Sequence, residues 1–353
     1  VGYILPKELI FKTSDVNDLS KKLLLLINLI KNKSKKIDLL KKNLKKKIDK
    51  NFQFLKQKEK FNIIWDYHIK NKNVLLIVPS LEGGGAERVM TFLSQDLNKI
   101  GYKTTLLVLG SSSQSQYRLD KRINLVFLNK TRSILATFDI IKYFFKNYDV
   151  AISTIVQCNI ICIFAKWITF SRIKLYVRET NTPSEILKYD WNIKNYITFI
   201  IRKFYNFSDL ILCNSFGVKT DLIKRLNIKR EKIFFLPNSI DKYQILKDSR
   251  EKIKKNYQPY YLFAGRLSKQ KNVQQIIQSF EIFCKENHNF KLMIFGQGSD
   301  KKNLIKLIND FKLQKKVFIK PFNKNIFKYI KNSNGVLLSS KWEGMPNILL
   351  QSL

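Results

Sequence analysis

Residues 74–88 read VLLIVPSLEGGGAER, and this stretch decides the fold. Its first five residues are all apolar, which is typical of a strand buried on both faces of a parallel sheet. The glycines Gly83, Gly84 and Gly85 follow where a helix is expected to begin. Such glycines let backbone N–H groups approach a ligand, and the positive end of the helix behind them attracts anions. The stretch predicts either an anion-binding turn or, with the same residues, a plain tight turn.

The alternation of strands and helices continues along the chain. Strands are expected at residues 74–79, 103–109, 124–128, 149–153, 174–177, 209–213, 260–264, 291–295, 316–319 and 335–339, and helices at 86–99, 272–286, 300–312 and 323–332. The most apolar segment, 151–170, contains Gln157 and Lys166, so it predicts a strand and a core helix rather than a membrane span. We therefore expect an α/β protein with two doubly wound domains that face a cleft.

The pattern divides the chain into four parts. Residues 1–70 are Lys-rich and helical in pattern, with Asp15 placed to cap a first helix and two more helices expected at 34–50 and 51–69. The first doubly wound domain is expected at 71–240, a polar linker at 241–258 and the second domain at 259–353. Ligands of such domains bind at the carboxyl ends of the strands.

The chain carries 65 Lys and Arg against 27 Asp and Glu, a formal net charge of +38 over 353 residues. A hydrophobic content of 45% excludes a disordered chain. Because 54 of the cations are lysines, a composition bias with solvated surface lysines accounts for most of the charge. The electrostatic field of this positive charge favours anionic partners. Because no nucleic-acid-binding module is recognisable, nucleic acid is not expected as a partner. The four cysteines are too few for a disulfide framework and are expected to be reduced, buried and cytoplasmic.

Two further motifs follow strands of the second domain. Arg266 and Lys271 stand five residues apart after its first strand. Two cations at this spacing can converge on one phosphate group, and the alternative is that both are ordinary surface cations. Glu343 and Gln351 follow its last strand and lie about two helical turns apart. That spacing suits two hydroxyl groups of one sugar-containing ligand, and a helix-capping role for Glu343 is the alternative.

Together these motifs resemble those of the retaining glycosyltransferases of family 4, which have the GT-B fold of two Rossmann-like domains. The matching words are GGGAERV at 83–89, SDLILCNS at 208–215, LPNSID at 236–241, GRLSKQKN at 265–272, FGQG at 295–298 and EGMPNILLQ at 343–351. They occur in the family's order over residues 73–353. Residues 1–70 look like the C-terminal portion of the same family, which indicates either the tail of an upstream module in a tandem protein or a circular permutation.

The resemblance implies transfer of a hexose or N-acetylhexosamine from a nucleotide-sugar, a UDP-sugar being the expected donor, with retention of configuration. The implied acceptor is a glycan or polyprenyl-linked precursor of a cell-surface polysaccharide or lipopolysaccharide. Arg266, Lys271 and Glu343 are the implied catalytic residues, the two cations on the leaving diphosphate and Glu343 on the donor sugar. The other implied donor-binding residues are Gly84, Gly85, Gly265, Gly296, Gly298, Asn347 and Gln351. No metal and no cofactor are implied.

Three interpretations depend on single features of the sequence. Arg178 and Glu179 end a predicted strand and are either acceptor-binding residues or a structural ion pair. The aromatic and basic stretch 191–207 predicts either contact with an anionic membrane surface, on the inner face of the plasma membrane, or a core helix. The family usually has Glu at position 351. The amide of Gln351 hydrogen-bonds a ribose diol without charge assistance, so an inactive or truncated module with a binding role is the alternative function.

Overall fold

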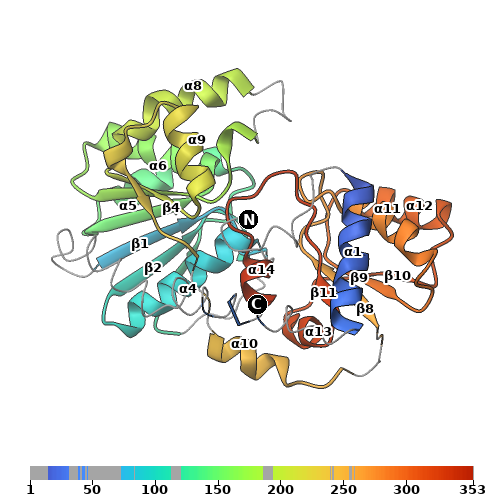
Figure 1. The fold of residues 1–353 in the computed structure, drawn as a ribbon. Coiled ribbons are helices and arrows are strands. Elements are labelled where there is room, and N and C mark those ends of the chain that lie inside the picture. The colour runs from blue at the N-terminus through green and yellow to red at the C-terminus, as the bar shows by residue number, and fades with distance from the viewer. Residues whose placement is uncertain are drawn as a thin grey trace. The chain divides into compact units, whose positions relative to one another are not determined.

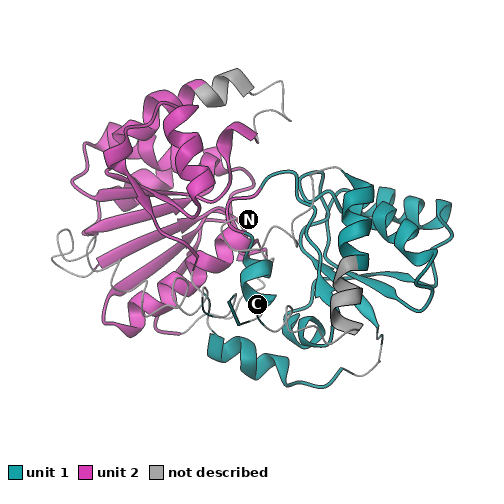
Figure 2. Ribbon diagram, viewed as in Figure 1, with its two compact units in different colours: residues 1–56, 240–342, 346–353 teal, residues 57–239, 343–345 magenta. Residues whose placement is uncertain are grey.

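The computed structural model describes residues 15–31, 39, 42–43, 46, 73–82, 84–112, 121–185, 194–238, 240, 242–253, 257 and 259–352. Most of the helices predicted at 34–50 and 51–69, and Gly83, lie outside the described residues. The chain forms two compact units, which Figure 2 colours separately. Unit 1 comprises Val1–Lys56, Ile240–Trp342 and Pro346–Leu353, and unit 2 comprises Gln57–Ser239 and Glu343–Met345.

Unit 2 is built on a parallel sheet. Its seven strands, counted over the described residues, are β1 (Asn73–Val78), β2 (Lys103–Val108), β3 (Asn124–Phe127), β4 (Val150–Thr154), β5 (Lys174–Glu179), β6 (Leu210–Cys213) and β7 (Ile233–Phe235). Their order is β3-β2-β1-β4-β5-β6-β7, a doubly wound arrangement whose direction reverses between β1 and β4. In open sheets of this kind, ligands bind at the carboxyl ends of the strands beside that reversal.

Apolar clusters cover both faces of this sheet. Because side chains alternate along a strand, Leu76 and Val78 join the cluster under α4, whereas Leu75 and Ile77 join the cluster under α5, α6, α8 and α9. The helices of unit 2, labelled where there is room in Figure 1, are α4 (Gly85–Lys99), η3 (Ser133–Ala136), α5 (Thr137–Phe144), α6 (Val156–Thr169), α8 (Lys194–Phe204), η4 (Tyr205–Phe207), α9 (Phe216–Lys224) and η5 (Arg230–Lys232).

Unit 1 has a second parallel sheet. Within the described ranges its four strands are β8 (Tyr260–Ala264), β9 (Lys291–Phe295), β10 (Val317–Lys320) and β11 (Gly335–Val336), in the order β10-β9-β8-β11. Its helices are α1 (Val16–Lys31), α10 (Lys242–Ser249), α11 (Val273–Cys284), α12 (Lys301–Asp310), α13 (Phe327–Lys331) and α14 (Asn347–Ser352). The strand order again starts in the middle and grows outward on both sides, as in unit 2.

Helix α1 belongs to the core of unit 1, although it precedes unit 2 in the sequence. Asp15 caps the helix as predicted, because its Oδ1 accepts a hydrogen bond of 2.8 Å from the backbone N–H of Asp18. Leu19 and Leu23 are buried in the same apolar cluster as Tyr261 of β8. The first helix of the segment that the sequence set apart is therefore part of the packing of the second sheet.

The structure differs from the predicted elements at three places. The strand predicted at 335–339 is shorter, because β11 pairs with β8 only over Gly335–Val336. Strand β7 was not predicted, because a three-residue strand gives too short a pattern to detect. Helix α10 lies inside the expected linker 241–258, held by Asn325, whose Nδ2 donates to the carbonyl of Asp248 at 2.8 Å. The apolar segment 151–170 forms β4 and α6, as predicted. In the part of the chain that the structure describes, no helix is long and apolar enough to cross a membrane.

Candidate functional site

The glycine turn after β1 begins helix α4. Gly84 is the N-cap residue and Gly85 the first helical residue. A Cβ on Gly84 would lie 2.0 Å from Oε2 of Glu87, so a side chain at position 84 would displace that carboxylate. Glu87 is itself buried in the first turn of α4. The turn therefore lies at the carboxyl end of β1, at the start of α4. That it binds an anion stays a prediction.

The side chain of Arg178 lies on the face of β5 that α4 covers. Its Nη2 donates a hydrogen bond to Oδ1 of Asn238, while Nη1 has no hydrogen-bond partner among the described residues. The side chain is 3% exposed. Thr154 is its register partner at the end of β4, and the Thr154 hydroxyl also lacks a partner there. A buried guanidinium with an unused donor is costly, so this edge of the sheet is suited to a polar ligand.

Glu179 lies on the opposite face of β5 and points into the protein. Its Oε1 accepts hydrogen bonds from Nδ2 of Asn159 at 2.9 Å and from the Tyr205 hydroxyl. Asn159 is oriented in turn by the Ser153 hydroxyl, which donates to its Oδ1 at 2.7 Å. At 1% exposure, the Glu179 carboxyl contacts protein rather than solvent. The alternation of the strand thus separates the two predicted acceptor-binding residues, Arg178 and Glu179, onto different faces.

Burial changes the pKa values of Arg178 and Glu179. It raises the pKa of Glu179 to about 7, against the opposing effect of the hydrogen bonds from Tyr205 and Asn159 and of the Arg178 charge. Burial likewise lowers the pKa of Arg178 to about 10, while the carboxylates of Glu179 and Glu87 act in the other direction. Arg178 therefore remains a cation at neutral pH, whereas Glu179 gains or loses its proton near neutral pH.

The loop Glu343–Met345 groups with unit 2. A Cβ on Gly344 would lie 2.0 Å from the carbonyl oxygen of Thr180, so the backbones touch at this glycine. Asn238 donates from Nδ2 to the carbonyl of Met345 at 3.3 Å. Asn238 thus contacts both Arg178 and the loop that contains Glu343. The half-buried Glu343 is thereby placed beside the end of β5 within unit 2.

In unit 1, two glycine-containing loops pack against each other at the ends of β8 and β9. A Cβ on Gly296 would lie 1.9 Å from the carbonyl oxygen of Gly265, and one on Gly298 would lie 2.2 Å from that of Leu267. Gly298 also has φ +154°. Leu267 N–H donates to the carbonyl of Gln297 at 2.8 Å. These glycines therefore allow the backbones of the two loops to meet, whatever ligand they bind.

The loop that carries Arg266 and Lys271 is also fastened to the loop after β11. Gln270 accepts a hydrogen bond at its carbonyl from Lys341 N–H at 2.8 Å and donates from Nε2 to the Trp342 carbonyl at 3.1 Å. The Ser339 hydroxyl donates to the carbonyl of Lys271 at 2.9 Å. Unit 1 therefore brings its two predicted cations together with the residues that lead into Glu343.

The side chains of these two cations differ in exposure. Arg266 is exposed, whereas Lys271 is half-buried and its Cε lies 3.7 Å from the Cβ position of Gly265. Asn347 and Gln351, both half-buried, lie on α14.

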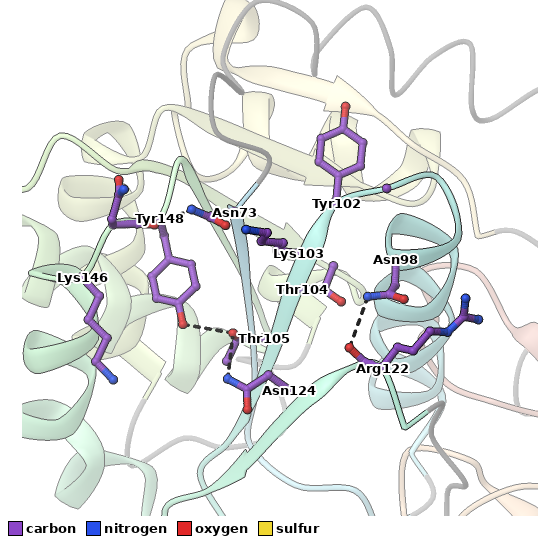
Figure 3. Close-up of a pocket in the computed structure, with 12 residues that line it drawn as sticks. Asn73, Asn98, Tyr102, Lys103, Thr104, Thr105, Arg122, Asn124, Lys146 and Tyr148 are labelled. Carbon is purple, nitrogen blue, oxygen red and sulfur yellow. Dashed lines mark hydrogen bonds between the residues drawn. The ribbon is translucent and has the colours of Figure 1, made fainter.

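One pocket of about 620 Å³ opens at the other edge of the unit 2 sheet, at the amino ends of β1, β2 and β3 (Figure 3). Lys103, Arg122 and Lys146 contribute positive charge to its lining. The Tyr148 hydroxyl and Nδ2 of Asn124 both donate to the Thr105 hydroxyl, at 3.0 and 3.2 Å. None of the predicted site residues lines this pocket, and it lies at the edge where ligands of doubly wound sheets do not bind.

The sequence did not single out four polar residues of unit 2 that the structure places around Arg178 and Glu179. They are Thr154, Asn159, Tyr205 and Asn238. Thr154 and Asn238 were detectable as polar residues at the ends of strands. Asn159 comes from α6, which follows β4, and Tyr205 comes from η4, which precedes β6, so only the fold brings both to Glu179.

Two parallel-sheet units with glycine turns at the carboxyl ends of their first strands are the architecture of the GT-B fold, which a class of glycosyltransferases has. Anabaena HepE in complex with UDP-glucose has this fold, with a TM-score of 0.58 at 14% identity over 76% of this chain and 74% of that one. A family model described as Glycosyltransferase Family 4 matches residues 83–243, and one described as Glycosyl transferases group 1 matches 245–353. The chain belongs to this family of glycosyltransferases.

Two curated relatives are similar in sequence. An uncharacterized glycosyltransferase of Methanocaldococcus jannaschii is 33% identical over 187 residues, which is 51% of this chain but only 45% of that relative. The N-acetylgalactosamine-N,N'-diacetylbacillosaminyl-diphospho-undecaprenol 4-alpha-N-acetylgalactosaminyltransferase of Campylobacter jejuni is 28% identical over 299 residues, 79% of this chain and 77% of that relative.

Proposed function

We propose that this chain transfers a hexose or N-acetylhexosamine from a nucleotide-sugar to a glycan or polyprenyl-linked acceptor in cell-surface polysaccharide synthesis. The observation that carries the proposal is the cationic loop of Arg266 and Lys271, tied to the loop that leads to Glu343. The Campylobacter relative is named for transfer to a diphospho-undecaprenol acceptor, and the Anabaena structure holds UDP-glucose. The first name supports a lipid-linked acceptor, and the second supports a UDP-sugar donor.

In this proposal, donor cleavage is driven by charge stabilisation. Negative charge develops on the departing diphosphate, and Arg266 and Lys271 are fixed cations that stabilise it in the transition state. Glu343 binds hydroxyls of the donor sugar, and Asn347 and Gln351 bind the sugar and the ribose. The two cations supply the charge that a metal would supply elsewhere, so the reaction proceeds without one. No histidine lies in the motifs to act as a base, which favours a leaving-group-assisted reaction with retention.

Unit 2 holds the acceptor in this proposal. The unused Nη1 of Arg178 and the Thr154 hydroxyl offer hydrogen bonds to it, and the turn at Gly84 and Gly85 binds negative charge. Glu179 acts through its neighbours, because its carboxyl is enclosed by Asn159 and Tyr205. It is therefore a positioning residue in this proposal, one step removed from the acceptor.

Substitution of the two cations tests the function. Arg266→Ala or Lys271→Ala is expected to lower kcat by about 10²–10³, the usual loss when one preorganised donor is removed. Lys269→Ala is the matched control, because Lys269 is an exposed cation of the same loop with no assigned role. The assay follows sugar transfer from UDP-sugars to lipid-linked acceptors, with donor-dependent thermal shift as a second readout. Equal activity of all three variants would contradict the proposal.

The alternative is an inactive module that only binds, and Gln351 is the residue that favours it. If the missing carboxylate limits donor binding, Gln351→Glu should strengthen the donor-dependent thermal shift, because a carboxylate accepts stronger hydrogen bonds from a ribose diol. A chain that shows no shift and no product, with either residue at 351, would favour the inactive module. We further propose a cytoplasmic location, which the four free and buried thiols support.

A further inference from the structure

Large aromatic side chains are exposed on the side of unit 2 that α5, α6 and α8 cover. We define the aromatic face as Phe138, Phe145, Phe164, Trp167, Phe170 and Phe199, all of them exposed. Phe138 is 77%, Phe145 72% and Phe170 87% exposed. Single exposed apolar residues need no explanation, but several on adjoining elements mark an interaction site. One of the two interpretations of the sequence put such a site at 191–207, and the aromatic face extends well beyond that stretch.

The elements that carry the aromatic face adjoin one another. Helix α6 contacts both α5 and α8, and Figure 1 shows the three helices together on unit 2. The Ser171 hydroxyl donates to the carbonyl of Phe144 at 2.9 Å, which holds the end of α6 against the end of α5. The rings of Phe164 and Trp167 lie 6.3 Å apart on α6. The exposed rings therefore come from three adjoining helices of unit 2.

The backbone conformation of Phe170 lowers the stability of the fold. It is the C-cap of α6 and has the left-handed φ of +46°, a conformation that helices usually assign to glycine. A bulky residue is strained there, and at 87% exposure its ring gains little from the core. Neither backbone geometry nor packing explains a phenylalanine at this position.

The charge around the aromatic face selects the partner. Residues 130–146, 156–174 and 194–209 carry ten Lys and Arg against two Asp. Asp139 is paired with Lys130 at 3.1 Å, and Asp209 is paired with Lys166. Lys203 lies over the ring of Phe199, with Nζ 5.3 Å from its centre. A second copy of the chain would bring like charges together, whereas an anionic surface is complementary to this one.

We propose that the aromatic face docks unit 2 onto an anionic lipid surface, with the rings at the headgroup level and the cations on the lipid charges. Aromatic rings favour the membrane–water boundary, and Lys and Arg stems extend along apolar surface to reach headgroups. This deepens the proposed function, because a polyprenyl-linked acceptor lies in such a surface.

Vesicle co-sedimentation of the full chain tests the proposal. Vesicles of phosphatidylcholine alone are compared with vesicles that also contain about one third phosphatidylglycerol, the fraction being chosen to give a strong surface potential. We expect binding to the anionic vesicles that weakens with salt. Phe138→Ser combined with Phe170→Gly should lower the partition coefficient by about tenfold or more. Because glycine relieves the strained φ at 170, lost binding with unchanged thermal stability cannot be assigned to unfolding.

Two further variants separate the contributions of the aromatic rings and of the cations to lipid binding. Tyr243→Ser removes a ring that is 79% exposed on α10 of unit 1 and should leave binding unchanged. Lys142→Ser combined with Arg172→Ser should lower binding to anionic vesicles by about thirtyfold and leave binding to phosphatidylcholine unchanged. Failure of the wild-type chain to bind either vesicle, or equal binding of all variants, would overturn the proposal. So would a wild-type dimer that the Phe138 and Phe170 changes dissociate without any effect on lipid binding.

The vesicles contain no donor and no acceptor, so the test does not depend on catalysis. A chain that binds vesicles but transfers no sugar refutes the proposed function alone. A chain that glycosylates a water-soluble acceptor fragment but ignores vesicles refutes the docking alone.

Discussion

The enclosed carboxyl of Glu179 makes the stability of unit 2 depend on pH. Its pKa is raised from 4.5 to about 7 by burial, so the folded state holds the proton more tightly than the unfolded chain does. At about 1.4 kcal/mol per pKa unit, this difference corresponds to about 3 kcal/mol of stability. The contribution is complete below the unfolded pKa and is lost as the pH rises from about 4.5 to about 7.

Glu179→Gln removes this dependence, because the amide keeps the shape of the side chain and cannot ionise. Its Oε1 still accepts from Asn159 and Tyr205. As the pH rises from about 4.5 to about 8, wild-type unit 2 should therefore lose about 3 kcal/mol relative to the variant. For a unit of about 150–250 residues, that is a relative change in Tm of about 6–12 °C.

Differential scanning calorimetry of both proteins across this pH range measures the effect. Glu281→Gln is the control, since it removes the same charge from a carboxyl of unit 1 that is 28% exposed and pairs with Lys285. The Glu281 variant should follow the wild-type pH profile. A difference in Tm between wild type and Glu179→Gln that stays within about 2 °C from about pH 4.5 to about pH 8 would refute the burial argument.

Two structural predictions concern unit 1. Gly296→Ala should destabilise it by about 2 kcal/mol or more and weaken the donor-dependent thermal shift, because the new Cβ would meet the Gly265 carbonyl at 1.9 Å. Gly335→Ala, whose Cβ would lie 3.4 Å from the Tyr261 ring, should be nearly neutral by the same calorimetry. Leu23→Ala in α1 should lower the free energy of unfolding of unit 1 by about 2–5 kcal/mol, as for a core leucine. Lys21→Ala on the exposed face of α1 should leave the free energy of unfolding unchanged. Equal effects of Leu23→Ala and Lys21→Ala would contradict the packing of α1 on unit 1.

The parallel sheets were predictable because buried parallel strands have a strong local pattern. β8 and β9 begin and end where the apolar runs at 260–264 and 291–295 predicted. Strand β7 and helix α10 were not predicted, since the first is too short to show a pattern and the second is held by contacts with residues far along the chain. The packing of α1 against α11 and β8 was likewise beyond local reasoning, because more than two hundred residues separate them.

The sequence by itself determined the strand-to-turn-to-helix units and their motif residues, because those depend on neighbours along the chain. Only the tertiary structure decided what each residue contacts. Adjacent residues of β5 point to opposite faces of the sheet, so Arg178 keeps an unused donor at its edge, whereas Glu179 is sealed beneath Asn159 and Tyr205. The glycines at 265, 296 and 298 are explained by loops that meet from different strands, and the aromatic face by helices that pack side by side. Burial and contact between distant segments set these properties, and no local pattern encodes them.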